Sequence, residues 1–477
     1  MAAPVSVAPR FPRRRAFLHA ARPEVDPALA HPKRHTVAGT LLLLYLAGIT
    51  LTDRIIARIT IPGVPIFAGE VVLAVGIIYL ACRRRPFRGL RTGNWLAPMA
   101  LALFLLWGLV EVVSSLNYSI IDVVRDSALV YYALFAVIAI GLAQYDSRFN
   151  PKELLRLYGE LVPWLIVIAP IRIIGFTNFD RQGPTIPGTD VWIYSSHRLG
   201  NLGVHLGLAV VYLATSGRND RKTTIAILAS ICMLIVIGSQ NRGGLLAGGV
   251  AIGIAVVIWT RHVKLRLGWL LATAVFLVVV LWSFDVRITT QNRELSVTQL
   301  VTNFQAIGGN AEGNSQAEGT IDFRTDLWHA VLEKTVQTGQ LENGWGFGPN
   351  LGSDFLPVGF DQQELRNPHN SHMTIIARLG LVGLGIWVVL WASWFVAVFG
   401  RARLAVRTRL FAADDTGRLA LFALCGVAAI LFNAYVDPTL ESPMVAVWLW
   451  SMFGFGVIAV AADRSPAITG DSAPALG

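Results

Sequence analysis

Cysteine and charged residues are both scarce in this chain. Only three of the 477 residues are cysteine, and Cys82, Cys232 and Cys425 all fall within apolar runs. This excludes an extracytoplasmic disulfide framework and a cysteine metal cluster. Charged residues make up 15% of the chain and hydrophobic residues 54%, which is far more apolar surface than one soluble core needs.

The apolar residues are gathered in blocks of about 18 to 22 residues, the length that a helix needs to cross a ~30 Å hydrocarbon core. The sequence therefore predicts an all-α polytopic membrane protein with about 12 transmembrane helices. The predicted spans are residues 38–52, 66–82, 95–116, 126–144, 158–176, 199–215, 223–239, 243–260, 266–284, 372–399, 417–436 and 442–462.

Most of the 40 Lys and Arg residues lie in alternate loops, beginning with the N-terminal segment and the Arg83–Arg85 loop. Short basic loops stay cytoplasmic, so both termini are predicted to be cytoplasmic. The net charge of +10 is attributed to this topology and not to nucleic-acid binding. The predicted parts are a disordered basic tail (1–37), nine spans (38–284), an extracytoplasmic loop domain (285–371), three spans (372–462) and a disordered tail (463–477).

The polar segment 285–371, between the ninth and tenth predicted spans, is the one segment long enough to be a small extracytoplasmic domain. Its pattern predicts a helix over 294–307, a mobile linker over 308–319, and a second helix from behind Thr320 to about Thr338. Arg324 and Trp328 share one face of that helix at i and i+4. The glycines Gly344, Gly346, Gly348 and Gly352 then predict sharp turns or a close backbone approach.

Five motifs in this order resemble the O-antigen ligase and Wzy polymerase superfamily over roughly residues 195 to 460. They are the Ser239–Gly244 turn, Arg324 with Trp328, the Gly344–Gly348 loop, Pro368-His369-Asn370 before a span, and the segment from Asn433 to Pro443. The resemblance implies an inverting, metal-independent glycosyltransferase of the bacterial cytoplasmic membrane with its active site outside. It implies no cofactor, a polyprenyl-diphosphate-linked glycan as donor, and a glycan, lipid or protein as acceptor, with membrane lipid around the chain.

Transfer from a lipid diphosphate needs a base for the acceptor hydroxyl and cations for the departing diphosphate. The resemblance assigns His369 as the catalytic base, and a histidine can hold a proton transiently at neutral pH. It assigns Arg242 and Arg324 to the donor diphosphate, which guanidinium groups bind bidentately. The structural alternatives are a helix cap or a position at the membrane interface for His369, with His372 as the rival base, and an interfacial anchor for Arg242. For Arg324 the alternative is a surface ion pair with an outer carboxylate such as Asp326 or Glu333.

A third predicted diphosphate ligand is Arg378, two turns below His369 on the predicted tenth span, with pairing to Asp437 or Glu441 as the alternative. Arg172 either faces the bundle or snorkels to the surface. The loop 176–198 mixes aromatic and polar residues that suit sugar rings or an ordinary interface. The residues predicted to support the site are Asn370, His372, Trp328, Arg198 and Arg172.

A twelve-span secondary transporter or flippase remains the alternative function, because many carriers have twelve spans with both termini inside. The large outer loop between spans nine and ten, and the lack of similarity between the two halves, favour the transferase. The motifs do not distinguish a ligase from a polymerase, and they do not name the sugar, the acceptor, the envelope type or the oligomeric state.

Overall fold

Apolar blocks become helices throughout the part of the chain that the structure describes. The computed structural model describes residues 35–61, 64–83, 95–179, 183–186, 192–193, 198–258, 261–283, 287–288, 295–307, 315–351, 367–407 and 414–462. All of these lie in one compact unit, Arg34–Gly477. The predicted tails lie outside the described residues, apart from the last three positions of the first one.

The first nine predicted spans correspond to a series of helices joined by short loops. Asp146 fixes the start of the series, because its carboxylate accepts from the Thr36 backbone N–H at 2.9 Å and from Arg148. The elements are α1 (Val37–Thr52), α2 (Arg54–Ala57), β1 (Thr60–Ile61), β2 (Val64–Phe67), α3 (Ala68–Ala81), α4 (Leu96–Ser114), α5 (Ile120–Asp126), α6 (Ala128–Tyr131), α7 (Leu134–Leu142), α8 (Pro151–Asn178), α9 (Leu199–Thr215), α10 (Arg221–Gln240), α11 (Arg242–Ile258) and α12 (Arg261–Ser283).

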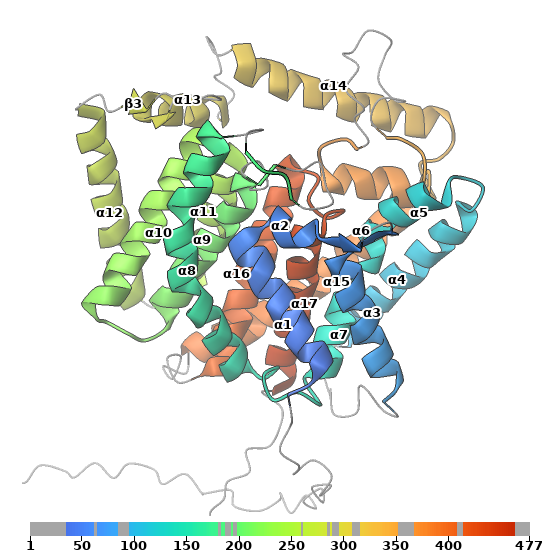
Figure 1. The fold of residues 1–477 in the computed structure, drawn as a ribbon, viewed down its shortest axis with the longest axis horizontal. Helices are drawn as coiled ribbons and strands as arrows, with labels where there is room; N and C mark the ends of the chain where they lie inside the picture. The colour runs from blue at the N-terminus through green and yellow to red at the C-terminus, as the bar shows by residue number, and fades with distance from the viewer. Residues whose placement is uncertain are drawn as a thin grey trace, which may run out of the picture. The chain divides into compact units, whose positions relative to one another are not determined.

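The second half holds the polar segment and the last three apolar blocks. Figure 1 shows α13 and α14 lying across one end of the helix bundle. Helix α14 begins earlier than predicted, so part of the predicted linker 308–319 is helical. The elements are β3 (Arg287–Ile288), β4 (Leu295–Ser296), α13 (Val297–Ile307), α14 (Ser315–Gln337), α15 (Ser371–Arg407), α16 (Asp415–Val436) and α17 (Pro443–Ala462). The two short strand pairs, β1–β2 and β3–β4, are antiparallel.

The architecture is that of a multi-pass membrane protein. Six helices among the described residues, α4, α8, α10, α15, α16 and α17, are long and apolar enough to cross a membrane. A bent pair, Ile120–Tyr131 with Leu134–Leu142, forms a seventh candidate with a 47° break, where the sequence predicts one unbroken span over 126–144. Five further apolar helices have 10–17 residues, so the count of about twelve spans stays a prediction.

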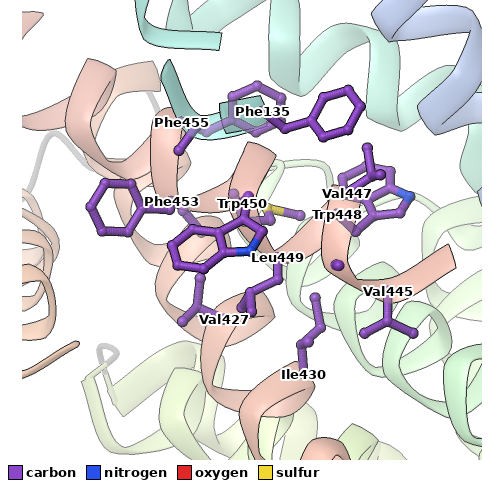
Figure 2. Close-up of a cluster of buried hydrophobic side chains, with 14 of the residues drawn as sticks. Phe135, Val427, Ile430, Val445, Val447, Trp448, Leu449, Trp450, Phe453 and Phe455 are labelled. Carbon is purple, nitrogen blue, oxygen red and sulfur yellow. The ribbon is translucent and has the colours of Figure 1, made fainter. Parts of the chain in front are cut away.

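The core of the bundle lies around α16 and α17. From Met444 to Ala459 every residue of α17 is buried, and Figure 2 shows its aromatic side chains gathered with Phe135 of α7. Trp450 stacks on Trp391 of α15, with ring centroids 5.5 Å apart. Because lipid is as apolar as these side chains, such close packing holds the helices together by contact and not by exclusion from water.

The predicted tenth span is broken near its start. At Gly380 the backbone of α15 has φ +64°, and the loop after α14 fills the break. The Leu381 backbone N–H donates to the Leu341 carbonyl at 2.9 Å, and the Trp345 N–H donates to the Ala377 carbonyl at 2.7 Å. A Cβ at Gly344 or Gly380 would overlap the opposing backbone. The glycine-rich loop therefore makes the close approach that the sequence predicts.

Candidate functional site

The site is built where α14 meets the segment before α15. The predicted apolar face of α14 packs against the rest of the protein, because Leu327 and Val331 are fully buried against Leu351 and Ala377. On the neighbouring face, the Trp328 Nε1–H donates to the Pro368 carbonyl at 2.7 Å. The Trp328 indole also contacts the Tyr435 ring, with centroids 5.6 Å apart. Trp328 thus ties the outer helix to the residue that precedes His369.

The start of α15 is fixed on both sides of its first turn. Asn370 caps the helix, because its Oδ1 accepts the backbone N–H groups of His372 at 2.9 Å and Met373 at 3.3 Å. The Ser371 hydroxyl accepts the backbone N–H groups of Thr439 at 3.0 Å and Leu440 at 3.1 Å, in the loop between α16 and α17. The position of His369 is therefore set by three separate elements.

His369 itself has φ +53°, in the left-handed region that non-glycine residues seldom adopt. Such a backbone is held in place only where its surroundings require it, and it clusters at functional sites. The imidazole is half-buried. Burial lowers the pKa of His369 below its ordinary value, the charge of Arg324 lowers it further, and Asp437 offsets part of the effect. The neutral ring, which is able to accept a proton, is therefore the prevailing form at neutral pH.

Arg324 lies in the same electrostatic neighbourhood as His369. Burial lowers the pKa of Arg324, and the Asp437 carboxylate raises it in part, yet a guanidinium stays charged at physiological pH. Arg324 makes no hydrogen bond and no ion pair with any residue that the structure describes. The predicted surface ion pair with Asp326 or Glu333 does not form.

Arg198 and Asp437 complete this group of charges. The Arg198 Nη1 donates to both Asp437 carboxylate oxygens at 3.2 Å, and both side chains are partly exposed. Arg198 also lowers the pKa of His369. A carboxylate shared by several guanidinium groups and an imidazole leaves the neighbourhood with an excess of positive charge.

Arg242 begins α11 next to the C-terminal end of α16. A Cβ at Gly243 would come within 2.6 Å of Val436 Cγ2, and one at Gly244 within 2.7 Å of the Leu199 carbonyl oxygen. The two glycines therefore allow the predicted close approach, and they place the start of α11 beside the residue that precedes Asp437. The Asn241 Oδ1 accepts the Gly244 N–H at 2.7 Å.

Arg378, the third predicted diphosphate ligand, is engaged inside the protein. It is fully buried, and its Nη2 lies 3.0 Å from the Asp126 carboxylate. Its Nη1 donates to the Gly346 carbonyl at 3.2 Å. Asp126 also accepts the Gly348 N–H at 3.1 Å. The ion-pair partner is Asp126 and not Asp437, and the pair fixes the glycine-rich loop. Glu441, the other predicted partner, lies within electrostatic range of Arg378.

Arg172, predicted as a supporting residue, neither snorkels nor faces the site. It is buried in an ion pair with Asp53, 3.0 Å from the carboxylate, and its Nη1 donates to the Thr50 carbonyl at 3.2 Å. His372 packs beside Trp387, and its Nε2 lies 3.0 Å from the Leu431 carbonyl oxygen. Both side chains therefore support the frame around the site.

Most of the predicted loop over 176–198 lies outside the described residues. Among the residues that are described, no group of three His, Cys, Asp or Glu side chains stands close enough to hold a metal ion.

The structure adds Asp437 to the neighbourhood of His369, and it places Arg54 and Arg58 close to Arg198. Arg54 and Arg58 lie in and just after α2, and both are within electrostatic range of Arg198. Sequence reasoning passed over these two arginines, although they follow the first apolar run on the same predicted side as His369. Asp437 was named only as a possible partner of Arg378.

Comparison with known proteins finds a family match over the region that holds the site. Residues 225–388 match the family model of the O-antigen ligases, which confirms the predicted resemblance to the O-antigen ligase and Wzy polymerase superfamily. The matched segment contains Arg242, Arg324 and His369, whereas Arg54 and Asp437 lie outside it. No curated protein matches the chain.

Proposed function

We propose that this chain, similar to the O-antigen ligases over residues 225–388, transfers a glycan from a polyprenyl diphosphate to an acceptor hydroxyl. The reaction takes place at the outer face of the cytoplasmic membrane, where we place the end of the bundle covered by α13 and α14. His369 is the general base. Arg324 and Arg242 bind the donor diphosphate.

One observation carries the proposal. His369 has a left-handed backbone and a lowered pKa, and it lies within electrostatic range of Arg324, a cation with no ion-pair partner among the described residues. A base that is neutral at working pH, beside a guanidinium that has no ion-pair partner among the described residues, suits transfer from a diphosphate.

The chemistry balances in one displacement. A ring nitrogen of His369 accepts the acceptor O–H proton while that oxygen forms a bond to the anomeric carbon. The bond from that carbon to the diphosphate oxygen breaks, and the polyprenyl diphosphate leaves with the electron pair. The imidazolium then releases its proton to solvent. A single displacement inverts the anomeric configuration.

The leaving diphosphate gains negative charge as its bond to the sugar breaks. Arg324 supplies a fixed positive charge from α14, and Arg242 supplies one from the start of α11. In a partly dry site such a charge contributes several kcal/mol to the transition state. We therefore propose that the guanidinium groups take the part of a metal ion. Arg378 is excluded from this role, because its charge is matched by Asp126.

The test is transfer by the purified full-length protein in detergent with EDTA, using a synthetic polyprenyl-diphosphate glycan. His369→Asn is the informative variant, because asparagine tolerates a left-handed backbone better than alanine does. We expect kcat to fall by about 10²- to 10⁴-fold, the usual contribution of a general base. The matched control is His329→Asn, an exposed histidine of α14.

Several outcomes would count against the proposal. Undiminished turnover in His369→Asn would refute the assignment of His369 as the base. Loss of all turnover with EDTA would refute the proposed metal independence. Retention of configuration at the anomeric carbon, measured by NMR, would exclude a single displacement. The assay is run with a glycan as the acceptor and, separately, with a lipid or a protein as the acceptor. Transfer to the glycan indicates a polymerase, and transfer to the lipid or protein indicates a ligase. Movement of intact donor across proteoliposomes without transfer would favour the flippase.

A further inference from the structure

The turn after α1 is fixed to the bundle by a single carboxylate. Asp53 has φ +52°, and its side chain is fully buried. Its Oδ2 accepts from Arg172 Nη2 at 3.0 Å and from the Arg198 backbone N–H at 2.6 Å, and its Oδ1 accepts from Asn201 Nδ2 at 3.1 Å. The charge of Asp53 is therefore matched by Arg172, and the position of Arg54, the next residue, follows from this anchorage.

Arg54 is a cation whose side chain has neither a hydrogen-bond partner nor an ion-pair partner among the described residues. Its side chain is half-buried, and its Nε is shielded from solvent without a hydrogen-bond partner. It makes no ion pair with a described residue. Burial, together with the charge of Arg198, lowers the pKa of Arg54 to about 10, so the group still carries its proton at neutral pH.

Positive charge outweighs negative charge around Arg54. Asp437 lies within electrostatic range of both Arg54 and Arg324, so these cations share one neighbourhood although they come from α2 and α14. The Asp437 carboxylate is already hydrogen-bonded to Arg198. Arg58 adds a further charge close to Arg198, and its guanidinium lies 6.0 Å from the centroid of the Phe67 ring.

Burying a charge without a partner is costly, and clustering like charges adds to that cost. A ligand with several anionic oxygens removes both penalties, and a diphosphate presents such oxygens in a geometry that guanidinium forks match. A phospholipid headgroup has the same chemistry but carries one phosphate.

We propose that Arg54 is a further ligand of the donor diphosphate, held opposite Arg324 by the Asp53 anchor. This inference rests on the proposed function and extends the site to a segment far outside the family match. Arg54 and Arg324 bind the diphosphate from two sides, while Asp437 and Arg198 balance the charge before the donor arrives.

The experiment measures binding of farnesyl diphosphate to the full-length protein in nanodiscs of zwitterionic lipid by calorimetry. Loss of one charged hydrogen-bonding partner is expected to raise Kd about tenfold in Arg54→Gln and in Arg324→Gln. Farnesyl monophosphate should show a smaller change. The matched control is Arg83→Gln, which removes one positive charge beyond the other end of α3 and should leave Kd within about twofold.

The outcomes separate this inference from the proposed function. Wild-type affinity in Arg54→Gln together with weak binding in Arg324→Gln would overturn the inference and leave the proposed function standing. Wild-type affinity in both variants would overturn the diphosphate site as a whole. If Arg54→Gln weakens the binding of phosphatidylglycerol as much as that of farnesyl diphosphate, the site is one for phospholipid and the inference fails.

Arg54→Lys keeps the charge but loses the fork, and it serves if Arg54→Gln does not fold. We expect its Kd to lie between those of wild type and Arg54→Gln. A Kd equal to that of wild type would show that the bidentate geometry has no part in binding.

Discussion

Replacing Arg378 with methionine should destabilise the protein without removing its diphosphate site. The substitution removes the buried cation that pairs with Asp126, which keeps only the half-exposed Arg125 at 3.6 Å among its described ion-pair partners, and it ends the bond to the Gly346 carbonyl. Both charged side chains of the pair are less than 5% exposed, at 1% and 4%. Breaking a buried pair on one side costs about 3–5 kcal/mol, much of it from the charge left behind.

Arg324→Met is the matched comparison, because its guanidinium has no ion-pair partner among the described residues. Its removal should change stability by less than about 0.5 kcal/mol, or stabilise the donor-free protein, because one like charge leaves the cluster. The two variants should differ the other way round in donor affinity. Arg378→Met should keep wild-type affinity in its folded fraction, whereas Arg324→Met should lose affinity.

The assay is the apparent melting temperature of the detergent-solubilised protein, followed by the loss of its monodisperse elution peak. Adding Asp126→Asn to Arg378→Met should recover part of the loss, because the amide oxygen can still accept the Gly348 N–H while the buried charge is gone. A wild-type melting temperature for Arg378→Met, combined with weakened diphosphate binding, would refute this reasoning and restore Arg378 to the donor site.

Three further predictions concern the base and its supports. The kcat/KM of the transfer should fall on the acidic side only below pH ~6.5, because the pKa of His369 is lowered. Arg324→Gln removes a charge that lowers the pKa of His369, so kcat/KM should begin to fall at a higher pH in this variant. An unchanged pH profile would contradict the prediction. Trp328→Phe, which loses the bond to the carbonyl before His369, should reduce kcat about tenfold with donor Kd unchanged, unlike a variant that merely unfolds. Gly380→Ala should fail to accumulate as folded protein, because its φ is +64° and a Cβ overlaps the facing loop, whereas Gly385→Ala, which meets open space, should behave as wild type in the same elution assay.

Much of the fold follows from apolar run length alone. Blocks of the right length coincide with helices, and the 3.6-residue period of α14 correctly predicts that Leu327 and Val331 face inward. The glycines of the outer loop and of the α11 start correctly predict close backbone approach, because glycine carries no Cβ to overlap a neighbour. These features depend on local pattern and need no knowledge of which helix packs on which.

The ion-pair partners could not be read from the same pattern. Arg172 and Asp53 are 119 residues apart, and Arg378 pairs with Asp126 on a helix that contributes no recognisable motif. Their pairing depends on which helices become neighbours and on how the bent α5–α7 region turns. Arg54 was missed for the same reason, because its distant charged neighbours, Arg198 and Asp437, come from the start of α9 and the end of α16.

The placement of the cations divides them into two kinds. Arg172 and Arg378 each face a buried carboxylate, and their pairs hold the α1 turn and the glycine-rich loop in place. Arg54 and Arg324 both lie within electrostatic range of Asp437, a carboxylate already hydrogen-bonded to Arg198, so the positive charge around that carboxylate is matched only in part. A rigid frame that holds like charges together stores binding energy for an anion, because the repulsion present before binding is relieved when the anion arrives. The Arg172–Asp53 pair therefore acts on the donor through the frame that carries Arg54, and weakening that pair should reduce donor affinity even where no residue of the site has changed.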